Sequence, residues 1–221
     1  MCSSDLDGDQ GFPGRLQVQL HLRLRGPLSL EMATEAQVSA PCPVAITQHA
    51  YFNLDGHLAD ARGQSLQLQA RQWLPVDDDL IPLGPLADVH GTGFDFRSPK
   101  PIARDWARDE VQRAGAGFDH AFLLDEACRD LSVPAARLTS ADGRLAMALE
   151  TTMPALQLYA GQMLRGAAAP TGEPIARGAG IALEPQFLPD SPHHPEWPQP
   201  SCWLLPGQVY RHLIRWHFEA A

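Results

Sequence analysis

Basic side chains are scarce in this sequence, and lysine is almost absent. The 221 residues carry 17 lysines and arginines against 26 aspartates and glutamates, for a formal net charge of −9, and Lys100 is the only lysine. Nucleic-acid affinity rests on clustered basic residues, so we expect no nucleic-acid partner. Schiff-base enzymes and P-loop proteins both need a well-placed lysine, and the Gly-Lys-Ser/Thr string is missing, which argues against both classes.

Cysteine is also infrequent. The four cysteines lie far apart and have no Cys-x-x-Cys spacing; they are Cys2, Cys42, Cys128 and Cys202. This pattern predicts neither a zinc ribbon nor a redox dithiol, and we interpret all four as reduced thiols. The adjacent His193 and His194 would point in opposite directions in an extended chain, so the sequence does not predict a metal site there.

Long apolar runs are missing as well. No stretch approaches the about 18 consecutive apolar residues that a membrane-spanning helix needs. Residues 1–10 lack the apolar core of a signal peptide. We therefore expect a cytoplasmic protein that does not bind a membrane.

Hydrophobic residues instead follow a period of two. Between Arg15 and Leu24, leucines and a valine alternate with polar residues, which predicts a half-buried β-strand. The same alternation recurs in five further segments, at 28–32, 66–70, 145–149, 156–158 and 210–218. The 20 prolines and 18 glycines separate these runs and are typical of turns, and only 103–113 has a mildly helical pattern. The sequence predicts an all-β protein, a mostly antiparallel sandwich or barrel, with residues 1–221 as a single domain.

Several polar side chains interrupt apolar, strand-like segments. His49 lies beside two aromatic residues, and Glu184 ends the apolar run 180–183. Asp119 stands between phenylalanines, and Gln157 lies within a hydrophobic strand. A carboxylate is costly to bury unless it is hydrogen-bonded or functional. Taken singly, each of these residues is more often structural than catalytic.

Their order along the chain resembles that of the aldose 1-epimerase (galactose mutarotase) family. The resemblance rests on short motifs spread from one end of the chain to the other: Asp7-Gly8-Asp9-Gln10-Gly11-Phe12-Pro13-Gly14, Gln48-His49-Ala50-Tyr51-Phe52-Asn53-Leu54 with Gly56-His57, Leu80-Ile81-Pro82 and Gly91-Thr92-Gly93-Phe94-Asp95-Phe96-Arg97, Gly117-Phe118-Asp119-His120, Leu156-Gln157-Leu158-Tyr159, Leu183-Glu184-Pro185-Gln186, 189–195 and 206–212. One such segment would be weak evidence, but the full series in the family's order is strong.

The resemblance implies a large β-sandwich that binds a free aldohexose and interconverts its α and β anomers without a cofactor or metal. It matches Glu184 to the catalytic base and His49 to the catalytic acid. It also matches Asp119 and Gln157 to positions that bind sugar hydroxyls. Tyr51 stands beside the acid, where it could bind the sugar or form one wall of its site. The oligomeric expectation is a monomer or a weak homodimer.

The chemistry explains these residue types. Opening a hemiacetal removes a proton from the anomeric hydroxyl while the ring oxygen gains one, so a base and an acid must act on neighbouring oxygens. A free imidazole is mostly neutral at pH 7, so a donor histidine needs a nearby carboxylate to keep its proton. Asp119 is the neighbour that we expect for His49.

The sequence departs from the family's pattern at its N-terminus. Full-length relatives have a substantial segment before the turn that here begins at Asp7, including an Asn-Arg pair and a His-Gly-Gly segment. Asn53 is the only asparagine, and no His-Gly-Gly occurs. Residues 1–6 also fit the family poorly. We therefore expect a β-sandwich that is incomplete at its N-terminus, from a truncated chain or an incomplete gene model.

Three functional readings remain open from the sequence. The first is an active mutarotase, supported by the intact pair of Glu184 and His49. The second is a catalytically silent fragment or a carbohydrate-binding β-sandwich module, because lost strands would leave sheet edges unpaired. The third is another sugar isomerase, for which the absence of an arginine cluster favours free over phosphorylated sugars.

Overall fold

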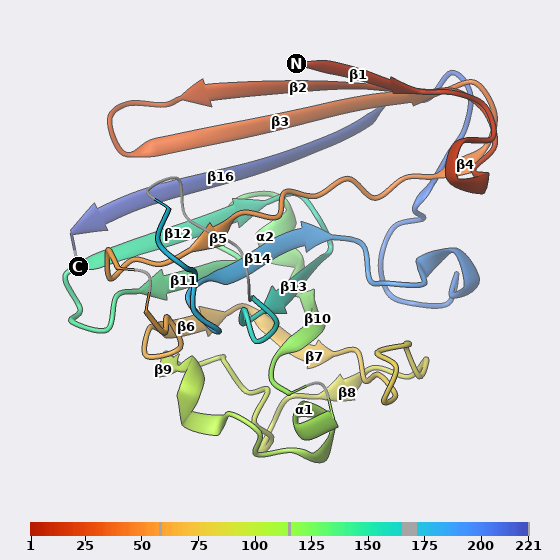
Figure 1. The fold of residues 1–221 in the computed structure, drawn as a ribbon. Helices are drawn as coiled ribbons and strands as arrows, with labels where there is room; N and C mark the ends of the chain where they lie inside the picture. The colour runs from red at the N-terminus through yellow and green to blue at the C-terminus, as the bar shows by residue number, and fades with distance from the viewer. Residues whose placement is uncertain (58, 115, 165–171, 221) are drawn as a thin grey trace.

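Two antiparallel sheets dominate the structure. The computed structural model describes residues 1–57, 59–114, 116–164 and 172–220 (Figure 1). Within these residues the strands form an eight-stranded sheet, a six-stranded sheet and a two-stranded sheet, and all the pairings are antiparallel. The all-β prediction is confirmed.

The larger sheet joins the two ends of the chain. Its strands, in spatial order, are β1 (Cys2–Asp5), β2 (Leu16–Leu24), β3 (Ser29–Val38), β16 (Tyr210–Ala220), β12 (Leu145–Thr151), β11 (Ala136–Thr139), β6 (Ser65–Leu68) and β9 (Lys100–Pro101). β16 pairs with both β3 and β12, so the C-terminal strand connects the N-terminal hairpin to the rest of the sheet.

The smaller sheets come from the middle and the end of the chain. The six-stranded sheet has the order β5 (Tyr51–Phe52), β14 (Ile181–Gln186), β13 (Ala155–Tyr159), β10 (Asp119–Leu124), β7 (Ala70–Trp73) and β8 (Ala87–Asp88). A short pair joins β15 (Trp203–Leu204) to β4 (Cys42–Pro43). The main core lies between the two large sheets and contains fully buried side chains from both, among them Leu66, Leu149, Leu156, Leu183 and Phe122.

Helical structure in the described residues is limited to short turns. The expected helix over 103–113 is replaced by a 3₁₀ turn, η2 (Ile102–Asp105), and a short helix, α1 (Glu110–Ala114). The sequence analysis did not predict the helix α2 (Glu126–Arg129). Two further 3₁₀ turns are η1 (Asp9–Gly11) and η3 (Ser191–His193). No helix in the described parts of the chain is long and apolar enough to cross a membrane.

The glycine-rich segment before β2 is a tight turn, as its composition indicates. Gly14 has a φ of +76°, and an added Cβ would lie 2.6 Å from the backbone nitrogen of Ala40. This close approach requires glycine for steric reasons as well as for its backbone conformation. The turn sets the start of β2 against the end of β3, where Leu16 pairs with Val38.

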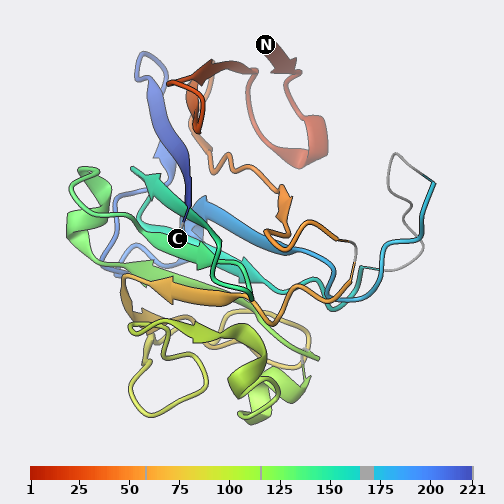
Figure 2. The same ribbon diagram turned by 90° about the vertical axis from the view of Figure 1, so that its left-hand side faces the viewer.

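The first three strands extend past the smaller sheet (Figures 1 and 2). As a result, β2 is less buried than its pattern predicts. Leu22 is 62% exposed and Leu24 is 80% exposed, although both lie on the strand's apolar face. Alternation predicted the strand correctly, but it could not predict whether another layer covers it.

Candidate active site

The candidate site lies on the face of the six-stranded sheet that points away from the main core. Along β14, Ile181 and Leu183 enter the core, so Glu184 faces the other way. Along β13, Leu156 and Leu158 enter the core, and Gln157 faces the other way. The two-residue period therefore places the polar side chains of both strands on one surface.

Strand register brings these side chains into neighbouring rows. Glu184 stands directly opposite Gln157. In the next row Asp119 stands opposite Tyr159, and Tyr159 stands opposite Ala182. Ala182 in turn pairs with Tyr51 on β5. The small side chain of Ala182 leaves space between the two tyrosines, whose ring centroids are 6.1 Å apart.

His49 reaches this surface from the irregular segment before β5. Its Nε2 lies 3.4 Å from Oε1 of Glu184. The histidine side chain is 50% exposed, whereas that of Glu184 is 9% exposed. The imidazole ring also packs 4.9 Å from the ring of Tyr51 and 6.3 Å from the ring of Tyr159, measured between centroids. The two aromatic rings therefore pack beside His49 where it contacts the carboxylate.

Asp119 and Gln157 form a second polar pair beside the first. Nε2 of Gln157 donates a 2.7 Å hydrogen bond to Oδ1 of Asp119. Oε1 of Gln157 is buried and has no hydrogen-bond partner in the described structure. A buried amide oxygen without a partner is unfavourable, so this atom is suited to accept a hydrogen bond from a ligand hydroxyl.

The carboxylates at this surface are more basic than usual. Burial raises the pKa of the Glu184 carboxyl, and the negative charge of Asp119 raises it further, while His49 opposes the shift. Burial also raises the pKa of Asp119, against the hydrogen bond from Gln157 and the charge of His49. For Tyr51 the same cause, burial, raises the pKa of the phenol, with smaller effects from Tyr159 and both carboxylates. A raised carboxyl pKa strengthens Glu184 as a proton acceptor.

Open space adjoins the polar surface on two sides. A cavity of about 190 Å³ is lined by Asp119 and Gln157 together with apolar side chains. A wider groove of about 1030 Å³ begins at Tyr51 and runs past Asn53 and His57. Small molecules bind in such concave places, where a few polar groups fix their orientation.

Comparison with known proteins places this arrangement in a family. The sequence model described as aldose 1-epimerase matches residues 2–217. The chain belongs to the aldose 1-epimerase family. It is 49% identical over 218 residues to the aldose 1-epimerase of Escherichia coli K12, covering 99% of this chain and 62% of the relative. It is also 35% identical over 217 residues to the galactose mutarotase of Rattus norvegicus, covering 97% of this chain and 61% of the relative.

Solved structures agree with this assignment. An aldose epimerase homologue from C. elegans superposes with a TM-score of 0.87 at 26% identity, over 100% of this chain and 65% of the homologue. The galactose 1-epimerase of Lactobacillus acidophilus gives a TM-score of 0.85 at 29% identity, over 100% of this chain and 62% of that protein. The chain therefore has the galactose mutarotase-like fold but spans less than two thirds of the length of these relatives.

All five residues that the family resemblance singled out lie on the one polar surface. They are Glu184, His49, Asp119, Gln157 and Tyr51. The carboxylate in contact with His49 is that of Glu184, whereas the sequence analysis expected Asp119 as its neighbour. Asp119 is hydrogen-bonded to Gln157 instead, and the charge of His49 acts to lower the pKa of Asp119.

Tyr159 belongs to the surface but was not predicted as a site residue. Its hydroxyl accepts a 2.9 Å hydrogen bond from the backbone nitrogen of Met163, which fixes the ring beside His49. Sequence periodicity contained a usable signal, because Tyr159 stands two residues after Gln157 and must share its face in an extended strand.

The surface offers hydrogen-bonding groups and one imidazole rather than a set of metal ligands. Among the residues that the structure describes, no group of three or more histidine, cysteine, aspartate or glutamate side chains could hold a metal ion. The buried Cys42, Cys128 and Cys202 are free thiols. Proton transfer at oxygen atoms is the chemistry that Glu184 and His49 are suited to perform.

Proposed function

We propose that this polar surface is the sugar site of an aldose 1-epimerase that interconverts the α and β anomers of free hexoses such as galactose and glucose. The observation that supports it best is the distance of 3.4 Å between Nε2 of His49 and Oε1 of Glu184. The two oxygens that exchange protons in a pyranose, the anomeric hydroxyl and the ring oxygen, are bonded to the same carbon. An acid and a base in direct contact can therefore reach both oxygens of one bound sugar at the same time.

The reaction follows from this pairing. The Glu184 carboxylate takes the proton of the anomeric hydroxyl as the bond between the anomeric carbon and the ring oxygen breaks, and protonated His49 gives its proton to that ring oxygen. The open-chain aldehyde then rotates about the bond between its first two carbons. Reclosure returns the glutamate's proton to the new anomeric hydroxyl and the ring-oxygen proton to His49, so both residues end as they began.

The neighbouring residues bind the sugar in this proposal. Asp119 and the free Oε1 of Gln157 accept hydrogen bonds from sugar hydroxyls, and Tyr51 forms a wall beside His49. The site requires no metal or cofactor, and its partner is the free aldohexose. Cytoplasmic location and a monomeric or weakly dimeric state remain predictions from sequence.

Polarimetry tests the proposal. Freshly dissolved α-galactose or α-glucose should reach anomeric equilibrium faster with the protein than in buffer, and Glu184→Gln should remove the acceleration. Equal rates with and without the protein would refute catalysis by the chain as it stands.

A carbohydrate-binding module without turnover is the second candidate. It is favoured by the half-exposed side chain of His49 and by the coverage of only 62% of the Escherichia coli relative. An open site binds sugar with fewer contacts and admits water to the acid. Calorimetry with galactose separates the two functions: heat of binding without accelerated mutarotation indicates the module.

A further inference from the structure

Few contacts fix the imidazole of His49. The residue lies on the irregular segment before β5, and its side chain is half exposed. Within the described residues, the approach of Nε2 to Glu184 is its only ion-pair or hydrogen-bond contact, and Nδ1 has no such partner. A histidine that transfers protons usually has its second ring nitrogen hydrogen-bonded to a fixed group. The orientation of this ring depends instead on its packing against Tyr51 and Tyr159.

The two tyrosines are fixed in different ways. Tyr159 lies on β13, inside the six-stranded sheet, and its hydroxyl accepts the hydrogen bond from the backbone nitrogen of Met163. Tyr51 lies on β5, a two-residue strand at the edge of the same sheet, and is 43% exposed. Its hydroxyl makes no hydrogen bond within the described part of the chain. The ring of Tyr51, which is the nearer one to His49, is therefore placed by the residues against which it packs.

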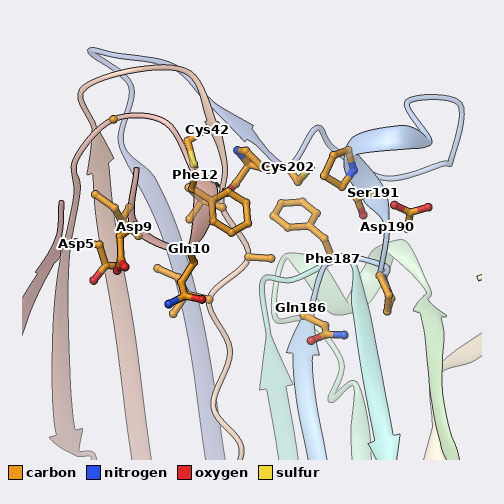
Figure 3. A pocket seen from close by; sticks show the side chains of 18 of the residues that line it. Asp5, Asp9, Gln10, Phe12, Cys42, Gln186, Phe187, Asp190, Ser191 and Cys202 are labelled. Atoms are coloured by element: carbon orange, nitrogen blue, oxygen red, sulfur yellow. Dashed lines mark hydrogen bonds between the residues drawn. The ribbon is translucent and has the colours of Figure 1, made fainter. Parts of the chain in front are cut away.

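The outer face of β14 is smallest at the end where Tyr51 lies. Gly180, just before the strand, has no side chain, Ala182 has a methyl group, and Glu184 and Gln186 are long. Figure 3 shows Gln186 at the far end of this series, where it lines an apolar pocket of about 560 Å³. Tyr51 pairs with Ala182 at the opposite end, where the strand has the least side-chain volume.

Gly180 is in close contact with Tyr51. A Cβ added at residue 180 would lie 2.8 Å from Cβ of Tyr51 and 3.5 Å from its Cγ and Cδ1. Carbon atoms pack at about 3.5–4.0 Å, so even one methyl group would force the two residues apart. The φ angle of Gly180 lies outside the left-handed region, so the backbone conformation does not require glycine. The close approach of Tyr51 does.

We infer that Gly180 is a positioning residue for His49 and acts through Tyr51. The absence of a side chain lets Tyr51 lie close against β14, from where its ring, together with that of Tyr159, keeps the imidazole beside Glu184. The consequence for turnover rests on the proposed function. The effect on the position of the imidazole does not.

Gly180→Ala tests the inference with a single added methyl group. It should displace Tyr51, and kcat for mutarotation should fall at least about tenfold, because a small misplacement of a reacting group is costly. Asp119 and Gln157, which bind the sugar hydroxyls in the proposed function, are not touched. KM should therefore change by less than about threefold.

A matched glycine provides the control. Gly63 also has a φ outside the left-handed region, and a Cβ added there would lie at an ordinary 3.6 Å from Cβ of Ala141. Gly63→Ala should leave kcat, KM and Tm unchanged.

A double-mutant cycle identifies Tyr51 as the intermediate. The three atoms nearest to a Cβ at residue 180 all belong to the side chain of Tyr51, and Tyr51→Gly removes all three. In that background, Gly180→Ala should lower kcat by no more than about twofold, because the residue through which it acts has gone.

Nuclear magnetic resonance follows the imidazole without turnover. Aromatic rings shift the resonances of nearby protons, so the ring signals of His49, assigned by their loss in His49→Gln, report the arrangement of Tyr51 beside them. These signals should move in Gly180→Ala and stay in place in Gly63→Ala. Thermal unfolding of the same samples shows whether each variant folds. If Gly180→Ala does not fold, Ala182→Val adds bulk beside the same ring and should move the same signals.

The inference fails if the His49 signals of the folded variant match those of the parent, or if Gly180→Ala lowers kcat equally in the Tyr51→Gly background. It also fails if KM rises as much as kcat falls, because Tyr51 would then act as a wall of the sugar site and not through His49. A parent chain that does not accelerate mutarotation would refute the proposed function, and the His49 signals would still decide the inference.

Discussion

Asp119 and His120 are neighbours on β10, yet they enter opposite faces of the six-stranded sheet. Asp119 lies on the polar surface, where its carboxylate is hydrogen-bonded to Gln157. His120 is fully buried in the core against the rings of Trp73 and Phe94. In both places burial disfavours the ionised form of the side chain. It therefore raises the pKa of Asp119 and lowers the pKa of His120 to about 4.

The two faces of the six-stranded sheet differ in the side chains that they hold and in what those side chains contribute. The inner face contains apolar side chains, and His120 is tolerated there because it stays neutral at neutral pH. The outer face holds carboxylates in a partly buried place, where burial raises their pKa values and makes them better proton acceptors, but where their ionised forms lower stability. Stability should therefore depend mainly on the inner face and turnover on the outer face. Four predictions test this division.

The largest effect is expected from the outer face at Glu184. Glu184→Gln keeps the shape of the side chain but removes the proton acceptor, so mutarotation by the active protein should fall by about 10²–10⁴-fold. The Tm should not fall, because a costly buried charge is lost. Polarimetry and thermal unfolding measure the two properties. His49→Gln serves as the parallel variant, and near-normal turnover in either would contradict their assigned roles.

The inner face should show the opposite result. Leu158→Ala deletes a fully buried side chain and should lower the free energy of unfolding by about 2–5 kcal/mol. Sugar affinity, measured well below the Tm, should stay unchanged. Leu24→Ala, at an exposed position, is the matched control and should change stability by no more than about 0.5 kcal/mol. Equal losses from both variants in urea unfolding would show that Leu24 is already covered in solution.

Asp119→Asn should weaken sugar binding and stabilise the fold. Losing a charged hydrogen-bond acceptor should raise KM about tenfold. The folded-state pKa of Asp119 lies above its unfolded value, so the native state is penalised once the pH rises through that folded pKa. The Tm of the variant should therefore exceed that of the parent at neutral pH, and the gap should close as the solution is acidified. A gap that widens in acid would contradict this assignment.

The smallest effect near neutral pH is expected at His120. Its folded-state pKa of about 4 lies below the value of about 6.5 for a free imidazole, so the unfolded chain binds the extra proton first. Stability should fall as the pH drops from about 6.5 towards 4, and His120→Gln should flatten this slope. Urea midpoints measured across that range give the slope directly. An unchanged slope would mean that other groups, such as the similarly buried His212, control it.

Local sequence pattern predicted much of this division. Successive residues of a strand point to opposite faces. The sequence alone therefore places Gln157 on the face opposite Leu156 and Leu158. It likewise places Glu184 on the face opposite Leu183. The family's motifs supplied the remaining site residues. The pattern failed at Leu22 and Leu24, where an apolar face has no covering layer, and at Tyr159, whose role depends on its neighbours across the sheet.

The sequence by itself determined which side chains share a face, where the turns fall, and to which family the series of motifs is similar. These properties depend on the backbone's period of two and on the order of residues. Only the tertiary structure decided that His49 meets Glu184, that Asp119 binds Gln157, and that β2 extends beyond the second sheet. Such contacts depend on register between distant strands and on the extent of each layer, and neither is encoded in a local pattern.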